Sequence, residues 1–201
     1  MCQNRTKIPN TKETIINNAK QIFLEKGYNN TLLLDIAKKC GLTRGGIYHY
    51  FKNKEDLFLE VMNKILDENE TLFLLLLDKD VSFKELLYDL CLLCIEFGKN
   101  CTVETKDSKI FFKHFSELLE TKKELSDRTK KMYENILKKL NMKIKEAQLS
   151  GEIKNHLDSK ELAVQISIIF EGATYSSYYL NLDYEKTVIT SFNLFWEFIK
   201  A

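Results

Sequence analysis

The stretch LLDIAKKCGLTRGGIYHYF, residues 33–51, contains the pattern that decides the fold. Two short helices that cross at a steep angle need a small residue at the crossing, a glycine in the turn and an aliphatic residue on the second helix. Ala37, Gly41 and Ile47 meet these demands at the fifth, ninth and fifteenth positions of the stretch. The spacing therefore predicts a helix-turn-helix, with an ordinary helical hairpin as the alternative.

The second helix of this motif opens with residues that are poor helix formers. Thr43 suits an N-cap, but Gly45 and Gly46 each destabilise a helix by about 1 kcal/mol relative to alanine. Glycines in a first turn let the backbone approach a DNA groove closely, and Arg44 can reach the acceptors of a guanine in the major groove. The residues that follow offer hydrogen-bond donors within reach of the DNA phosphates, namely Tyr48, His49, Tyr50 and Lys54.

Charge is distributed unevenly along the chain. Residues 1–54 contain ten Lys or Arg against three acidic residues, a net charge of +7, whereas the remainder carries a net charge of −6. A basic N-terminal part suggests a polyanionic partner, and an acidic remainder argues against wrapping that partner over the whole protein. Double-stranded DNA is the expected partner.

The composition favours long helices. One proline and seven glycines interrupt 201 residues, and apolar residues recur at three- and four-residue intervals after Pro9. We expect an all-α fold of about nine helices, divided into a helix-turn-helix domain at residues 1–53 and a larger helical domain at residues 54–201. One helix is expected to end at Gly27, and later breaks are expected at residues 78–82, 98–105, 120–125, 151–158 and 181–183.

These motifs resemble the signature of the TetR family of one-component transcriptional regulators over residues 11–60. The matching segments are Gly27-Tyr28, Asp35-Ile36-Ala37, Gly41-Leu42-Thr43-Arg44, Ile47-Tyr48-His49-Tyr50-Phe51 and Lys54-Glu55-Asp56-Leu57-Phe58. The resemblance implies a repressor that binds a palindromic operator as a homodimer and is released by a small-molecule ligand bound in residues 54–201. A DNA-binding regulator without such an effector is the alternative. The DNA surface implied by the resemblance consists of Thr43, Arg44, Gly45, Gly46, Tyr48, His49, Tyr50 and Lys54.

The chain departs from the family pattern at the start of the first motif helix. Leu32 and Leu34 stand where the family usually has a capping threonine and, two residues later, a polar residue. We therefore expect Thr31 to cap this helix one residue early and include it among the DNA-contacting candidates.

The last two helices carry apolar stripes that need partners. The resemblance implies that they pair with their copies in a four-helix dimer interface, which suits the twofold symmetry of a palindromic operator. Packing against the chain's own core is the alternative. The expected interface residues are Leu162, Ile166, Ile169, Ala173, Val188, Phe192, Phe195, Trp196 and Ile199.

Aromatic residues in the larger domain are compatible with either a ligand pocket or a packed core. The candidates for ligand contact are Cys94, Phe111, His114, Phe115, Phe170 and Tyr175.

Cys91 and Cys94 form a CxxC pair, which suggests a thiol or metal sensor as a further alternative function. The lack of a second CxxC or of clustered histidines favours a buried structural pair. No metal, cofactor or enzymatic activity is expected, because no catalytic constellation is present. A polar N-terminal segment, without any apolar run of about 18 to 20 residues, predicts a cytoplasmic protein with reduced cysteines.

Overall fold

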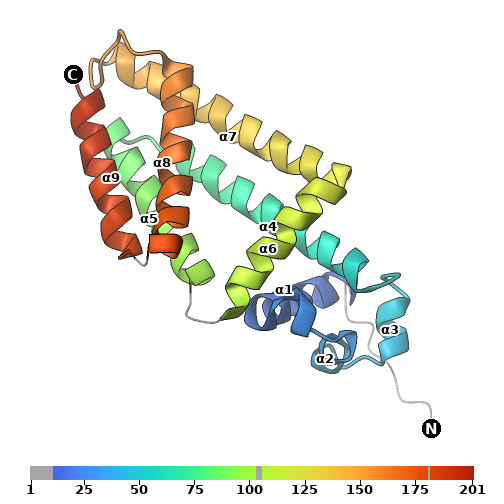
Figure 1. Cartoon of the computed structure of the whole chain (residues 1–201). Helices are drawn as coiled ribbons and strands as arrows, with labels where there is room; N and C mark the ends of the chain where they lie inside the picture. The colour runs from blue at the N-terminus through green and yellow to red at the C-terminus, as the bar shows by residue number, and fades with distance from the viewer. Residues whose placement is uncertain (1–10, 103–105, 181) are drawn as a thin grey trace. The chain divides into compact units, whose positions relative to one another are not determined.

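The computed structural model describes residues 11–102, 106–180 and 182–201, with the side chains of 97–113 and 174–180 left out. Within these ranges the chain is all-α, as predicted, and forms nine helices (Figure 1). They are α1 (Thr11–Asn30), α2 (Leu33–Lys39), α3 (Arg44–Tyr48), α4 (Lys54–Leu77), α5 (Phe83–Thr102), α6 (Lys106–Thr121), α7 (Lys123–Leu149), α8 (Ser159–Leu180) and α9 (Tyr184–Ile199).

Several helix ends follow from local chemistry. Gly27 interrupts α1 with φ 71° and ψ 168°, a backbone conformation that glycine adopts without steric penalty. At the start of α4, Asn53 Oδ1 accepts a hydrogen bond from the Asp56 amide at 2.8 Å. The Asp56 carboxylate in turn accepts one from the Lys52 amide at 2.9 Å, so the turn before α4 is fixed by reciprocal side-chain contacts.

The described chain divides into two compact units that are not contiguous in sequence. The first unit combines the described residues up to Leu66 with those between 104 and 126, and the second combines residues 67–103 with residues 127–201. Helix α6 therefore belongs to the same unit as the helix-turn-helix, although about forty residues of the second unit separate the two in sequence.

The first unit has its own apolar core. Phe23, Ile36, Ile47, Phe51 and Phe58 are almost completely buried. The rings of Phe23 and Phe58 meet edge to face, with centroids 4.9 Å apart. Burial of these three phenylalanines, together with the buried aliphatic residues, stabilises the unit.

Helix α6 completes the first unit by packing against α1. The imidazole of His114 stacks on the ring of Tyr28, with centroids 3.9 Å apart and planes inclined by 18°. Phe58 lies beside both rings, at 4.9 Å from Tyr28 and 5.2 Å from His114. This aromatic cluster ties α1, α4 and α6 together within the unit.

The second unit buries the apolar faces of α5, α7, α8 and α9 around one core. Helix α5 packs against both α8 and α9. The Glu152 carboxylate, in the turn after α7, accepts hydrogen bonds from the amides of Phe83 and Lys84 at 2.8 and 2.9 Å. An acid at these positions satisfies unpaired amides of the α5 N-terminus and complements the helix dipole.

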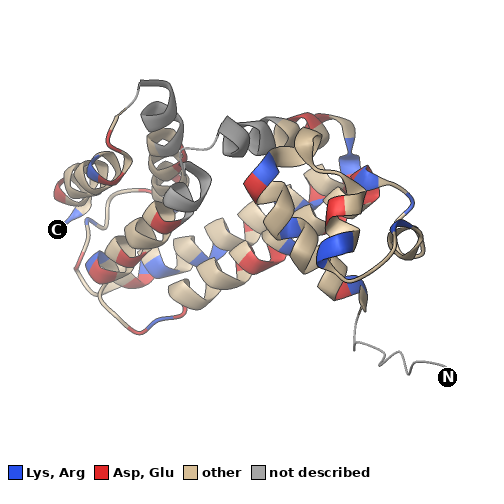
Figure 2. Ribbon diagram, turned by 90° about the horizontal axis from the view of Figure 1, so that it is seen from below, with Lys and Arg blue, Asp and Glu red and all other residues tan. Residues whose placement is uncertain are grey.

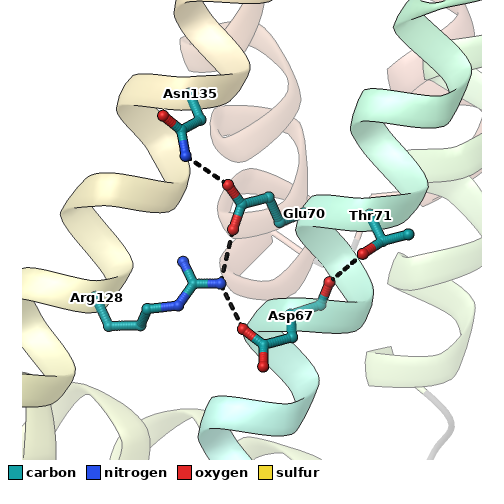
Figure 3. Close-up of polar contacts among 5 residues, drawn as sticks. All are labelled: Asp67, Glu70, Thr71, Arg128 and Asn135. Carbon is teal, nitrogen blue, oxygen red and sulfur yellow. Dashed lines mark hydrogen bonds and ion pairs between the residues drawn. The ribbon is translucent and has the colours of Figure 1, made fainter.

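A polar network joins α4 to α7 in the same unit (Figure 3). The Arg128 guanidinium donates to the carboxylates of Asp67 and Glu70, the latter at 2.7 Å, and Asn135 donates to the other oxygen of Glu70 at 2.7 Å. These contacts hold the pKa of Glu70 below its usual value, with the Asn135 hydrogen bond as the main cause. Because Glu70 is mostly buried, its paired carboxylate fixes the register of the two helices.

None of the described helices is both long and apolar enough to cross a membrane.

Candidate nucleic-acid interface

Helices α2 and α3 form the predicted helix-turn-helix. Ala37 and Ile47 are completely buried between the helices, and Gly41 in the turn has φ 65°, which favours glycine. The Leu42 amide donates to the Ala37 carbonyl at 2.8 Å and closes the turn. The three positions that defined the motif in the sequence therefore have the roles that their spacing predicted.

The N-terminus of α3 is capped and open to solvent. The Thr43 hydroxyl accepts a hydrogen bond from the Gly46 amide at 3.2 Å, which confirms Thr43 as the N-cap. Arg44 is exposed, and its guanidinium lies 5.5 Å from the centre of the Tyr48 ring and donates to the Tyr48 hydroxyl at 3.2 Å. The charged group of Arg44 is thus held along the exposed side of α3.

Gly45 has no structural reason to be glycine. Its φ is not positive, and a Cβ built on it would find its nearest neighbour, the Thr43 hydroxyl, at 3.8 Å, which is ordinary contact. At Gly46 the nearest atom, Leu42 Cβ, would lie at 3.4 Å, which is still tolerable. Neither backbone geometry nor packing within the first unit explains the pair.

The exposed side of α3 continues into the turn before α4. Tyr48, His49 and Tyr50 are all exposed, and the His49 and Tyr50 rings meet edge to face at 5.0 Å. Lys52, which sequence reasoning passed over, is exposed on this turn. The sequence offered one signal for Lys52 as a DNA-contact candidate, because it lies two residues before Lys54, the lysine of the family signature.

Part of the positive charge of the first unit is neutralised within the unit. Lys12 pairs with Glu60 at 2.7 Å and Lys26 with Asp35 at 3.2 Å, so basic and acidic residues lie close together on its helices (Figure 2). The lysines of this unit that are exposed and without an ion pair among the described residues are Lys38, Lys39, Lys52 and Lys123.

Two predicted DNA contacts are placed differently from expectation. Lys54 turns inward and donates to the backbone carbonyls of Tyr28 at 2.7 Å and Thr31 at 3.0 Å. Thr31 is completely buried and its hydroxyl donates to the Gly27 carbonyl at 2.7 Å, while the N-cap of α2 is Leu32, which makes no side-chain cap. The expectation that Thr31 caps α2 is therefore wrong, because its hydroxyl satisfies the carbonyl at the kink of α1 instead.

Comparison with known proteins agrees with this geometry. The family profile described as "Bacterial regulatory proteins, tetR family" matches residues 15–61, which contain the whole helix-turn-helix. The helix-turn-helix region of the chain is therefore of the TetR-family type.

Its relatives match mainly in this region. The chain is 43% identical over 54 residues to the HTH-type transcriptional regulator QacR of Staphylococcus aureus, across 27% of this chain and 29% of QacR. The match to this chain covers only 21% and 35% of the lengths of two further curated relatives. A longer match, 28% identical over 144 residues, covers 72% of this chain and 71% of the Fatty acid metabolism regulator protein of Bacillus subtilis.

The likeness in fold extends over nearly the whole chain. The crystal structure of FadR from Bacillus subtilis in complex with stearoyl-CoA superposes with a TM-score of 0.60 at 21% identity, over 91% of this chain and 96% of FadR. At this identity the match establishes the TetR-like architecture and nothing about the ligand.

The predicted dimer residues lie mainly on the core-facing sides of α8 and α9. Six of the nine are buried in the core of their own chain, and Ile169, Phe195 and Trp196 are half-buried. The buried six are Leu162, Ile166, Ala173, Val188, Phe192 and Ile199. Among the described side chains of these two helices, the large apolar ones left exposed are Val164 and Ile168 on α8 and Leu194 and Phe198 on α9. Periodicity detected the apolar helices but assigned the core-facing stripe to the interface.

The four ligand candidates with described side chains are divided between the two units. Cys94 and Phe170 belong to the second unit, and His114 and Phe115 belong to the first. The Cys94 carbonyl accepts a hydrogen bond from the Tyr184 hydroxyl at 2.9 Å, and Phe170 packs on the core of the second unit. The side chains of Phe111 and Tyr175 lie outside the described residues.

The CxxC pair has the chemistry of buried structural thiols. Both cysteines are free, and burial raises the pKa of each to about 12, assisted by their mutual proximity at Cys91 and by Glu171 at Cys94. A thiol with so high a pKa is almost fully protonated at neutral pH and is a poor nucleophile. The described residues also contain no group of three or more side chains suited to a metal ion.

Proposed function

We propose that this chain is a DNA-binding transcriptional regulator that represses transcription from a palindromic operator as a homodimer. The observation that carries the proposal is Gly45 at the first turn of α3. Glycine there weakens the helix, and no contact or dihedral angle within the protein requires it. A requirement for close approach by an outside surface accounts for it.

The neighbours of Gly45 suit the DNA major groove. A helix enters the groove with its N-terminal residues at the base edges, and Arg44 extends from that end with its guanidinium exposed. A bidentate contact to guanine O6 and N7 is the role we assign to Arg44. Tyr48, His49 and Tyr50 are assigned to the flanking phosphates and sugars.

Replacing Gly45 with alanine tests the proposal. We expect Gly45→Ala to leave the fold intact and to raise stability by up to about 1 kcal/mol, because alanine is the better helix former and its Cβ has room. Specific DNA affinity is expected to fall by about 1 to 3 kcal/mol, because the methyl group holds α3 away from the base edges. Thermal unfolding and fluorescence anisotropy measure the two effects.

A variant that is equally stable or more stable and still binds operator as wild type would contradict the assignment of α3 to the groove. Operator fragments for this measurement are obtained by sequencing the DNA that co-purifies with the protein.

For the homodimer we propose the exposed stripes of α8 and α9. Val164 and Ile168 are spaced one helical turn apart, as are Leu194 and Phe198, so each helix presents a compact apolar ridge. Two such helices and their twofold copies form a four-helix contact, and twofold symmetry matches two half-sites spaced by about 34 to 36 Å.

Release by a small molecule is the regulatory part of the proposal, with residues 1–53 as the DNA-binding domain and 54–201 as the effector domain. Helix α4 begins at this division and continues without a break past Leu66, the boundary between the two compact units, so a tilt of α4 can change the spacing of the recognition helices. One relative is named as a fatty acid metabolism regulator, and FadR was crystallised with stearoyl-CoA. Long-chain acyl-CoA is therefore the first effector class to test.

If stearoyl-CoA is an effector, operator DNA and stearoyl-CoA should weaken each other's binding by the same factor, about 5- to 150-fold, because coupling between two sites is reciprocal. Calorimetric titration of stearoyl-CoA with and without saturating operator measures the factor. Tight binding with equal affinity in both titrations would remove stearoyl-CoA as an effector and leave the DNA-binding proposal standing.

A further inference from the structure

We propose that Lys54 is a positioning residue inside the first unit, and that Lys52, in the turn between α3 and α4, contacts a DNA phosphate. The inference rests on the proposed function, since it concerns how the same surface meets DNA. It departs from the role that family resemblance assigns to Lys54.

The ammonium group of Lys54 is already occupied. Two of its three N–H donors bond the carbonyls of Tyr28 and Thr31, at 2.7 and 3.0 Å, and the nitrogen lies 4.3 Å from the centre of the Tyr28 ring. Burial lowers the pKa of Lys54 relative to an exposed lysine. Moving the ammonium group away from these carbonyls toward a phosphate would break both hydrogen bonds and leave two carbonyls without this donor.

The carbonyls bonded by Lys54 belong to separate elements. Tyr28 lies just beyond the kink at Gly27 in α1, Thr31 precedes α2, and Lys54 is the first residue of α4. One ammonium therefore joins the end of α1, the approach to α2 and the start of α4 within the first unit. Because α2 leads directly into α3, this junction fixes the orientation of the recognition helix.

Lys52 has the opposite properties. Its side chain is exposed and forms no ion pair within the described part of the chain, so its charge is available. Its own amide donates to the Asp56 carboxylate at 2.9 Å, which fixes the backbone of the turn. The other nearby acid, Glu55, is paired with Lys122. A lysine on a fixed turn directly after the recognition helix suits a phosphate contact.

The dependence of affinity on salt separates the two roles. The binding constant K falls as salt concentration rises. Each phosphate neutralised by a lysine on duplex DNA makes the negative slope of log K against log salt concentration steeper by about 0.9. A positioning residue that touches no phosphate adds nothing to this slope, even when its loss weakens binding.

The test compares Lys52→Ala, Lys54→Met and the wild-type full chain on a random-sequence duplex of about 30 base pairs, or three helical turns. We expect Lys52→Ala to reduce the slope by about 0.9 per protomer. Lys54→Met should leave the slope unchanged, weaken binding to operator DNA measured in parallel, and speed amide exchange between residues 28 and 36. Methionine keeps the length of the lysine side chain without its charge.

A reduced slope for Lys54→Met, or an unchanged slope for Lys52→Ala, would overturn the inference. If Lys54→Met does not fold, the salt slope of Lys52→Ala still tests whether Lys52 contacts a phosphate, because this substitution is at an exposed side chain. Amide exchange in Lys54→Arg then tests whether Lys54 joins α1, α2 and α4. A wild-type protein that binds no DNA at low salt would instead reject the proposed function.

Discussion

Replacing Phe198 and Leu194 together with aspartate is expected to convert the proposed dimer into a folded monomer. Both side chains are mainly exposed in the single chain, 59% for Phe198 and 69% for Leu194, so charge there does not disturb the core. In the proposed interface each aspartate would be buried without a partner, which costs several kcal/mol per charge. Sedimentation equilibrium measures the loss of the dimer, and circular dichroism checks that the fold is retained.

The matched control lies on the other side of the same helix. Phe192 is only 6% exposed and packs in the core of the second unit, so Phe192→Asp buries an unpaired charge in the monomer itself. That variant should unfold or be insoluble, whereas the Leu194/Phe198 variant stays soluble. A double variant that remains a dimer would exclude this face from the interface.

Truncating Phe58 to alanine is expected to destabilise the first unit by about 3 to 5 kcal/mol, as for other fully buried phenylalanines. Phe58 is completely buried and touches the rings of Phe23, Tyr28 and His114, so its loss leaves a cavity shared by α1, α4 and α6. Hydrogen exchange should speed up in these helices first, and DNA binding should fall with the folded fraction of the unit.

The control for this cavity is Leu32→Ala, which removes an exposed apolar side chain from the same unit. Its effect on stability should stay within about 0.5 kcal/mol, as for surface substitutions in general. Comparable destabilisation by both variants would show that the aromatic cluster has no special role in holding the unit together.

Sequence patterns predicted the features that depend on local spacing. The helix-turn-helix requires fixed residue types at fixed intervals, so Ala37, Gly41 and Ile47 identified it without reference to the rest of the chain. The N-cap at Thr43 has the same local origin. Both are set by interactions between residues no more than a few positions apart.

Patterns failed where the outcome depends on contacts that are distant in sequence. Nothing near Lys54 indicates that its ammonium bonds carbonyls 23 and 26 residues earlier. The choice between the Phe192 and Phe198 sides of α9 likewise depends on which side α5 and α8 cover. A hydrophobic period identifies an apolar helix, but on a helix with two apolar sides it does not identify the covered one.

The discontinuous first unit has a consequence for the order of folding during synthesis. A nascent chain released only to Leu66 lacks α6, so the side of α1 that α6 covers and the ring of Tyr28 stay open to water or chaperones. Fifty-five further residues must be added before Thr121 completes α6. At about 5 to 20 residues per second this delay lasts roughly 3 to 11 s. The ribosome therefore releases a complete helix-turn-helix sequence well before the unit that supports it can close.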